Sequence, residues 1–384
     1  MITRLRIQNY KALRDVSLDL TPIHVLIGPN DSGKTSILEV VAALSRSVDH
    51  PLQAAFAGPW DGAKLVWRGD AGLPVAIAAT VEQPPLEYRL AVRFPAAGRD
   101  VRLESESVSI GGALPATDLT QVGHPRSRIC DIASFNTVAT PELREIAATV
   151  HDALGGVHFY RWNSRLLALP AAPDSKRQYR MDPSGFGLAM CLDDILGYDR
   201  NLFGNLEDRF REVFPQVKSI KLKPEPAYRA PSEEAEPVPL LGHADGKGIY
   251  FEFADGGALV PAAHVSDGMM LVLAYLAVLN LPDPPRILLI EEPENGIHPQ
   301  RLHEVLAILR ELAGEQSRSQ VLLTTHSPYV VDRFPPEEVT ICRKSIDGSV
   351  ETTRLSESTA VREQMDVFTL GEIWTAEGDD ALVQ

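Results

Sequence analysis

Eight consecutive residues near the N-terminus have the spacing of a phosphate-binding loop, GxxxxGK[ST]. They are Gly28, Pro29, Asn30, Asp31, Ser32, Gly33, Lys34 and Thr35, and Ser36 follows them. Glycines let the backbone N–H groups of such a loop point at phosphate oxygens, Lys34 can reach the β- and γ-phosphates, and the Thr35 hydroxyl can bind Mg²⁺. An apolar strand precedes the loop and an amphipathic helix follows it, so an ordinary glycine-rich turn is the weaker interpretation.

A pair of carboxylates follows a second apolar segment. The sequence RILLIEEPE begins at Arg286 and places Glu291 and Glu292 directly after a predicted buried strand. In open α/β sheets, ligands bind at the carboxyl ends of the strands. Glu291 is therefore predicted to hold Mg²⁺ through its water shell, and Glu292 to polarise an attacking water. The alternative is a solvated acidic turn.

Two further segments carry groups suited to phosphate chemistry. A strand at 321–325 delivers His326, which is predicted to hydrogen-bond the γ-phosphate. Ser266 and Gly268 open an apolar helix, where a hydroxyl and free N–H groups would form an anion site. A structural histidine and a plain helix cap are the corresponding alternatives.

The elements that position these groups follow from hydrophobic periodicity. Alternating residues predict two strands over 1–20, and a short apolar strand is expected at 24–27. The segments 64–68, 75–82, 88–94 and 101–110 predict an antiparallel sheet, and 113–140 is expected to be a long loop or lid. Helices are predicted at 141–154 and 187–213, and strands at 156–162 and 249–253. A mobile loop is predicted at 224–247, and alternating helices and strands from 268 to about 335 predict a parallel sheet.

The bulk composition sets further limits. The chain has 384 residues and a formal net charge of −15, so it is not a polycation that coats nucleic acid. Its three cysteines have no metal-ligand spacing, which favours buried or idle thiols in a reducing cytoplasm. The N-terminus shows no apolar signal segment, and no apolar run is long enough to span a membrane. A cytoplasmic protein without a membrane partner is expected.

Five segments of the chain, taken in order, resemble the ABC-type AAA ATPases of the RecF, SMC and OLD group. They are NYKALRD, GPNDSGKTS, SDGMM, ILLIEEPENGIHP and TTHSP. The resemblance implies an ATP- and Mg²⁺-dependent ATPase that works as a head-to-tail homodimer. Ser266 and Gly268 would then contact the γ-phosphate held by the partner chain, and residues 295–298 would resemble the D-loop at the dimer seam. The signature departs from Ser-Gly-Gly-Gln, and no clear Q-loop glutamine is present; Asn163 is a weak stand-in. Tyr10 and Lys11 lie where the family's N-terminal turn approaches the nucleotide.

The predicted fold is an α/β P-loop NTPase of the ABC-ATPase type, with a mixed or parallel core sheet, an antiparallel β lobe and a helical lobe. Residues 1–345 are expected to form the ATPase head. Its nucleotide-binding core would comprise 1–62 and 247–345, and its inserted lobes 63–246. Residues 346–384 are expected to form a short tail without room for a TOPRIM nuclease, and no heptads for a coiled-coil arm are seen.

These features favour an ATP-gated dimeric switch that controls a separate effector protein, such as a nuclease, or bound nucleic acid. Bacterial anti-phage defence is the role that the resemblance implies. Two alternatives are a RecF-like DNA-repair ATPase and a nucleotide-gated scaffold with little turnover; a transporter ATPase fits least. Four small basic clusters leave DNA or RNA as a candidate partner, although each cluster is ordinarily explained as part of a solvated surface. They are Arg126/Arg128, Arg161/Arg165, Lys176/Arg177/Arg180 and Lys218/Lys221/Lys223.

Overall fold

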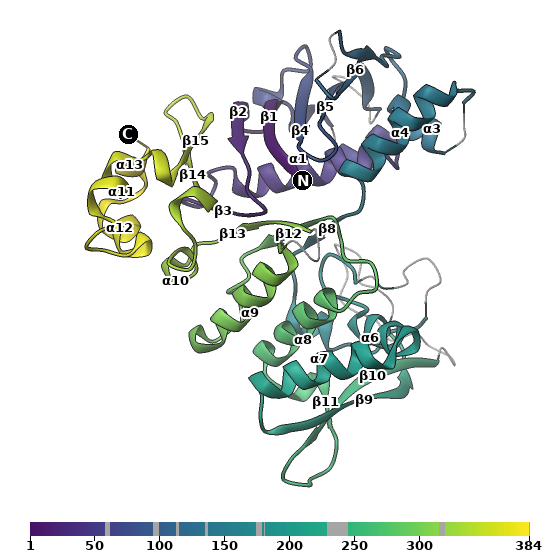
Figure 1. Cartoon of the computed structure of the whole chain (residues 1–384), viewed down its shortest axis with the longest axis vertical. Helices are drawn as coiled ribbons and strands as arrows, with labels where there is room; N and C mark the ends of the chain where they lie inside the picture. Colours follow the sequence, from purple (N-terminus) through teal and green to yellow (C-terminus); the bar gives the residue numbers. More distant parts are fainter. Residues whose placement is uncertain are drawn as a thin grey trace. The chain divides into compact units, whose positions relative to one another are not determined.

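The computed structural model describes residues 1–57, 62–94, 100–112, 115–134, 137–173, 179, 181–228, 245–314 and 319–383. The chain divides into two compact units (Figure 1). The first comprises Met1–Phe159, Pro285–Glu291 and Arg318–Gln384, and the second comprises Tyr160–Pro284 and Glu292–Ser317. The boundary between the units thus falls between the two carboxylates of the predicted site.

An antiparallel sheet forms one layer of the first unit, in the order β2-β1-β4-β5-β6-β7. Its strands are β1 (Ile2–Tyr10), β2 (Leu13–Asp19), β4 (Val75–Val81), β5 (Leu86–Arg93), β6 (Arg102–Ile110) and β7 (Thr117–Asp118). Alternate side chains of β1 and β2, such as Leu5 and Val16, are buried, as the periodicity predicted. The β-rich segment that starts at residue 63 therefore extends the sheet that β1 begins, because β4 pairs with β1.

A mixed sheet forms the other layer of the first unit, in the order β15-β14-β3-β13-β12-β8. Its strands are β3 (Ile23–Ile27), β8 (Val157–Tyr160), β12 (Ile287–Glu291), β13 (Gln320–Thr324), β14 (Val339–Lys344) and β15 (Val350–Arg354). β3, β12, β13 and β14 run parallel, whereas β15 returns antiparallel beside β14. Most side chains of β3, β12 and β13 are apolar, and nearly all of them are buried, as is usual for strands that are covered on both faces.

Helix α1 (Lys34–Ser47) packs against strands of both layers, touching β1 on one side and β12 and β13 on the other. Its buried residues, including Ile37, Val41 and Leu44, belong to one continuous apolar core with Leu5 of β1 and Leu322 of β13. The rest of this part of the chain forms α2 (Leu52–Phe56), α3 (Arg128–Ala133) and α4 (Pro141–Leu154). Because the first turn of α1 directly follows the phosphate loop, the packing of α1 against both sheets fixes the position of the loop.

The C-terminal residues of the first unit are folded. They form α10 (Pro328–Val331), α11 (Thr359–Gln364), α12 (Leu370–Glu377) and α13 (Asp379–Leu382) in addition to β15. Residues 346–384, which the sequence analysis sets apart as a tail, thus contribute the edge strand β15 to the mixed sheet. Helix α10 matches the last helix predicted before residue 335, whereas the β14–β15 hairpin and α11, α12 and α13 were not anticipated.

The second unit is mainly helical and surrounds one buried helix. Helix α8 (Asp267–Leu279) is buried along nearly its whole length and contacts α5 (Ser164–Leu167), α6 (Leu188–Tyr198), α7 (Arg200–Val213) and α9 (Pro299–Leu312). The ring of Tyr275 lies 4.5 Å from that of Trp162, centroid to centroid. A small antiparallel sheet of β9 (Val217–Pro226), β10 (Asp245–Phe253) and β11 (Val260–Pro261) completes the unit.

Several secondary-structure predictions are wrong in detail. Residues 64–68, predicted as a strand, form parts of two short 3-10 turns, at Gly62–Leu65 and Trp67–Gly69. The predicted loop at 113–140 contains α3, and the predicted loop at 224–247 begins inside β9 and ends inside β10.

The basic cluster Lys176/Arg177/Arg180 lies outside the described residues. Cys130, Cys191 and Cys342 are free and buried, as expected. No described helix has the length and apolarity that a membrane crossing needs.

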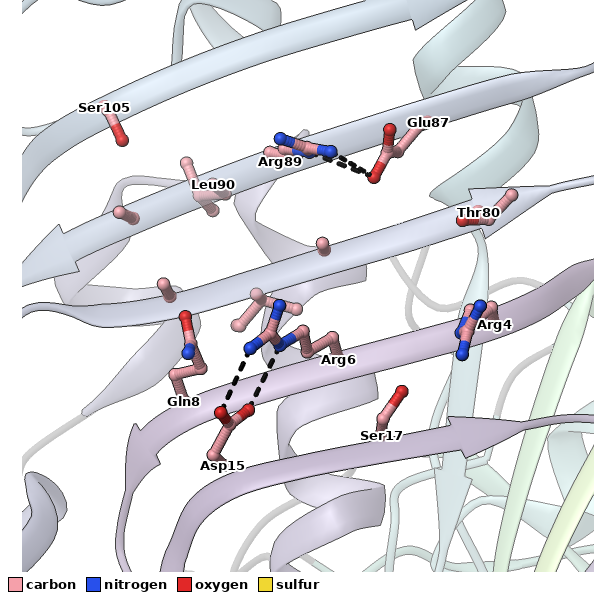
Figure 2. Close-up of a pocket in the computed structure, with 14 residues that line it drawn as sticks. Arg4, Arg6, Gln8, Asp15, Ser17, Thr80, Glu87, Arg89, Leu90 and Ser105 are labelled. Atoms are coloured by element: carbon pink, nitrogen blue, oxygen red, sulfur yellow. Dashed lines mark hydrogen bonds and ion pairs between the residues drawn. The ribbon is translucent and has the colours of Figure 1, made fainter. Parts of the chain in front are cut away.

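The outer face of the antiparallel sheet is hollowed over about 800 Å³ (Figure 2). Arg4, Arg6 and Arg89 project from this face, but each lies beside a carboxylate. Arg6 forms two hydrogen bonds with Asp15, of 3.1 and 3.0 Å, and Arg89 pairs with Glu87 at 2.9 Å. Arg4 lies 3.5 Å from Asp19. No residue of the predicted nucleotide site lines the hollow, and the paired charges give it little net attraction for a polyanion.

His24 joins β3 to β14 inside the mixed sheet. Its Nδ1 lies 3.0 Å from Thr21 Oγ1, and its Nε2 lies 2.9 Å from Thr340 Oγ1. Burial, with a smaller contribution from Arg354, lowers the pKa of His24 to about 3. The imidazole therefore stays neutral in the folded protein at any pH near neutrality.

Because the unfolded histidine binds a proton below about pH 6.5 and the folded one does not, folding stability should fall as the pH drops from about 6.5 towards 3. Between pH 7.5 and 5.5 we expect the wild type to lose about 1.4 kcal/mol more unfolding free energy than His24→Gln, which cannot titrate. Urea unfolding at the two pH values measures this difference. Identical pH dependence in the two proteins would show that His24 is not held neutral.

Candidate nucleotide site

The phosphate loop follows β3 and has the backbone of an anion cradle. Gly28, Asp31 and Gly33 all have positive φ angles, of 129°, 63° and 91°. Only glycine adopts the first of these readily, and a Cβ at Gly28 would lie 2.1 Å from the backbone oxygen of Cys342. The loop therefore has the curvature that an anion cradle needs, and its first glycine cannot be replaced without moving the backbone.

Lys34 occupies the centre of this loop. Its Nζ donates hydrogen bonds to the carbonyls of Gly28 (2.9 Å) and Pro29 (2.7 Å) and lies 3.4 Å from Ser32 Oγ. The side chain is only 6% exposed, so the surrounding backbone holds the ammonium inside the loop. Gly33 precedes the first helical residue, and the 14-residue helix α1 adds its positive end to this charge. When a triphosphate binds, its oxygens would replace the carbonyl oxygens of Gly28 and Pro29 as acceptors for the Lys34 ammonium.

Glu291 and His326 reach the same edge of the mixed sheet as the loop. The register pairs Glu291 with Thr324, and Thr324 with Leu26, so the carboxyl ends of β12, β13 and β3 are level. The Thr325 amide donates to the carbonyl of Leu26 (3.1 Å), which fixes the start of the segment carrying His326. Both Glu291 and His326 are half-buried. The structure thus brings together the loop, one carboxylate and the histidine, as the alternation of strands predicted.

This edge offers oxygen donors suited to Mg²⁺. Thr35 is exposed in the first turn of α1, and the Glu291 carboxylate ends β12, two strands away from β3 in the sheet. A hydroxyl and a carboxylate, completed by phosphate oxygens and water, form the type of ligand set that Mg²⁺ prefers. Among the described residues, no group of three or more His, Cys, Asp or Glu side chains is arranged so that it could hold a metal ion by itself.

Glu292 begins the second unit with an uncommon backbone conformation. Its φ is +48°, a left-handed value that is costly for a residue with a Cβ and that clusters at functional sites. The Asn295 side-chain amide donates to Glu292 Oε2 at 2.5 Å, and the Asn295 backbone N–H donates to the Glu292 carbonyl at 3.0 Å. The turn 292–295 therefore holds both the backbone and the carboxylate of Glu292 in one orientation.

Ser266 caps the N-terminus of α8, where its Oγ accepts a hydrogen bond from the Met269 amide (3.4 Å). Ser266 is exposed, and Gly268 is half-buried in the same first turn. Gly296, in the segment after Glu292, packs against this turn, because a Cβ on it would lie 3.0 Å from Leu271 and 3.6 Å from Asp267. Within the second unit, the predicted signature helix and the predicted D-loop are therefore neighbours.

Sequence reasoning missed the part of the site contributed by the β14–β15 hairpin. Lys344 forms an ion pair with Asp31 of the phosphate loop, and Val350 leaves no space for a Cβ on Gly33. These residues lie more than 300 positions from the loop, and no motif marks them. Asn163, the weak Q-loop stand-in, caps α5 by accepting a hydrogen bond from the Arg165 amide (3.0 Å).

The chain is similar to several known families and proteins. The family described as "AAA domain, putative AbiEii toxin, Type IV TA system" matches residues 188–332, and the family "AAA ATPase domain" matches residues 1–70. An OLD nuclease of Thermus scotoductus is 23% identical over 401 aligned positions, which span 97% of this chain and 68% of that protein. The fold is similar to that of an SMC head solved in complex with the C-terminal winged-helix domain of ScpA. That match has a TM-score of 0.53 at 16% identity and covers 93% of this chain and 99% of the SMC head.

One of these families covers the phosphate loop and the other covers α8, Glu291, Glu292 and His326. The chain therefore resembles AAA ATPase domains over residues 1–70 and 188–332 and an OLD nuclease over nearly its whole length, and its fold is similar to that of an SMC head.

Proposed function

We propose that this protein binds and hydrolyses ATP with Mg²⁺ and acts as a dimeric switch. The observation that supports the proposal is the level edge of β3, β13 and β12, at which the phosphate loop with Lys34, the carboxylate of Glu291 and the segment that carries His326 follow the three strand ends. In this scheme the loop holds the triphosphate, and Thr35 and Glu291 hold Mg²⁺. Glu292 polarises the attacking water, and His326 bonds the γ-phosphate.

The dimer completes the site in this proposal. A single phosphate loop leaves the γ-phosphate open to water, where electrostatic stabilisation of the transition state is weak. Ser266 presents its hydroxyl on the surface of the second unit, and Gly268 adds an N–H in the first turn of α8. Such a helix start is suited to a phosphate that is bound by another copy of the chain. ATP would thus close two copies, and hydrolysis would let them separate.

Replacing Ser266 by aspartate tests this arrangement directly. Aspartate caps a helix as well as serine, so α8 and the fold should be unaffected, but its negative charge would oppose a γ-phosphate. We expect Ser266→Asp to bind MgATP within about threefold of wild type. In the Glu292→Gln background, where ATP is not consumed, it should fail to form the ATP-dependent dimer in light-scattering measurements.

Thr140→Asp is the matched control, because Thr140 is an exposed N-cap that accepts a hydrogen bond from the Leu143 amide on α4. The control should dimerise like wild type. ATP-dependent dimers of Ser266→Asp as stable as those of the control would contradict the proposed contact.

The switch would act on a separate effector protein or on bound nucleic acid, and bacterial anti-phage defence is the role we propose. The support is the family match to a toxin–antitoxin AAA domain and the resemblance to an OLD nuclease. Affinity purification of Glu292→Gln with ATP, followed by mass spectrometry, should recover an effector that is absent when ATP is omitted. Double-stranded DNA or RNA as the sole ATP-dependent companion would support the nucleic-acid form of the switch.

A RecF-like DNA-binding ATPase is the second candidate, because the ten-residue strand β9 carries three exposed lysines. Lys218 pairs with Glu252, and Lys223 lies over the ring of Tyr250. Lys221, which lies between them in the sequence, is exposed. DNA binding through such lysines should be ATP-dependent and fall steeply with salt. Fluorescence anisotropy with DNA in a salt series, with and without ATP, separates this function from control of a protein partner.

A further inference from the structure

The phosphate loop contains a carboxylate where a polyanion is expected to bind. Asp31 lies three positions before Lys34, and its side chain is 82% exposed. Its φ of +63° explains the residue type only in part, because glycine, asparagine and aspartate all tolerate the left-handed region. Glycine or asparagine would meet the backbone requirement without placing a negative charge beside the triphosphate.

Strand β14 brings a lysine to this carboxylate. Val339 pairs with Val25, and Ile341 with Ile27, so β14 and β3 run side by side to the start of the loop. Beyond this point β3 continues into the loop, and β14 ends at Lys344. Lys344 Nζ forms an ion pair with Asp31 Oδ2. The Lys344 ammonium is thereby placed at the exposed side of the loop, whereas the Lys34 ammonium lies inside the loop.

The hairpin that carries Lys344 is anchored on both sides. The Asp347 carboxylate is 3.3 Å from Arg14 Nη1, and the Asp347 carbonyl accepts a hydrogen bond from Arg68 Nη2 (3.0 Å). The Val350 amide donates to the carbonyl of Ala12 (3.0 Å), in the turn between β1 and β2. Val350 also packs directly on Gly33. Lys344 is therefore held by a fixed hairpin beside the loop.

We propose that Lys344 is a positioning residue for the nucleotide, which neutralises Asp31 and keeps that carboxylate turned away from the phosphates. The inference rests on the proposed binding of ATP at the loop. Without the lysine, the uncompensated Asp31 charge would repel the multiply charged triphosphate through the surrounding water, over the short width of the loop. ATP affinity would thus depend on the hairpin at the C-terminal side of the core sheet.

A double-mutant cycle that removes the charge at each of these two positions tests the proposal by calorimetric titration of each full-length variant with MgATP. Lys344→Met should bind about tenfold more weakly than wild type, the equivalent of about 1.4 kcal/mol. Asp31→Asn should bind at least as tightly as wild type, because asparagine keeps the left-handed backbone without the charge. The double variant Asp31→Asn/Lys344→Met should return to within about threefold of wild type.

Lys221→Met, which removes the same charge from an exposed site on β9, should leave the affinity unchanged. Neutralisation predicts that Lys344→Met weakens binding only while Asp31 is charged and has no effect in the Asp31→Asn background, whereas a structural role or direct contact of Lys344 with phosphate would weaken binding by the same factor in both backgrounds. Equal affinities of Lys344→Met and wild type, or a double variant as weak as Lys344→Met, would overturn the proposal. A wild type that binds no MgATP would instead overturn the proposed function.

Discussion

Replacing Glu292 by glutamine should slow ATP hydrolysis at least about a hundredfold, which is the usual scale for losing a group that orients or activates the nucleophile. ATP affinity should change little, because the phosphate loop and the Mg²⁺ donors remain. The amide is nearly isosteric with the carboxylate and can still meet Asn295, which holds Oε2 in the wild type. The expected result is therefore a protein that accumulates bound ATP, measured as phosphate release together with retained nucleotide after gel filtration.

The matched control is Glu304→Gln, the same change on α9 outside the predicted site. It should hydrolyse ATP at the wild-type rate. Equal rates for Glu292→Gln and Glu304→Gln would remove Glu292 from the reaction. If both matched a wild type with negligible turnover, the protein would be a nucleotide-gated scaffold.

Gly28→Ala should cost about 3 kcal/mol of unfolding free energy or more, a larger effect than a typical single substitution. The new Cβ would lie 2.1 Å from the Cys342 oxygen, so either β3 and β14 separate or the phosphate loop shifts. Each outcome also disturbs the carbonyl of Gly28 that receives Lys34. MgATP binding should therefore weaken at least about tenfold along with the loss of stability.

Gly123→Ala separates the two causes of strain in that prediction. Gly123 also has a positive φ, of 78°, but nothing lies within 4 Å of the Cβ that alanine would add. Its cost should be only the backbone term, about 1 kcal/mol. Urea unfolding of both variants measures the comparison. A Gly28→Ala protein as stable as Gly123→Ala, and with wild-type affinity, would mean that the loop does not have the tight packing described for it.

The central edge of the site was predictable because it depends on local signals. Apolar runs ending in Glu291 and Thr325 indicate buried parallel strands, and parallel strands present their carboxyl ends at one edge. The GxxxxGK[ST] spacing then fixes which end binds phosphate. The likeness to an SMC head bears out the predicted fold, and an AAA ATPase family matches residues 1–70, which include this loop.

The contribution of the hairpin was not predictable, because it depends on long-range pairing. Lys344 meets Asp31 only because β14 joins the sheet beside β3, and nothing in the sequence near Lys344 records that neighbour. Residues 64–68 alternate like a strand, yet Val66 forms only an isolated bridge to Tyr10 and the flanking residues turn. Periodicity shows which side chains seek burial but not whether a partner strand is available.

The central claim is that a triphosphate and its magnesium are held at the loop around Lys34. Isothermal titration of the wild type with ATP, in Mg²⁺ and in EDTA, against the same titrations of Lys34→Met, measures it most directly. The account predicts saturable, magnesium-dependent binding to the wild type that weakens at least about a hundredfold without the lysine ammonium. Heat signals that are absent from the wild type, or equal in the two proteins, would contradict it.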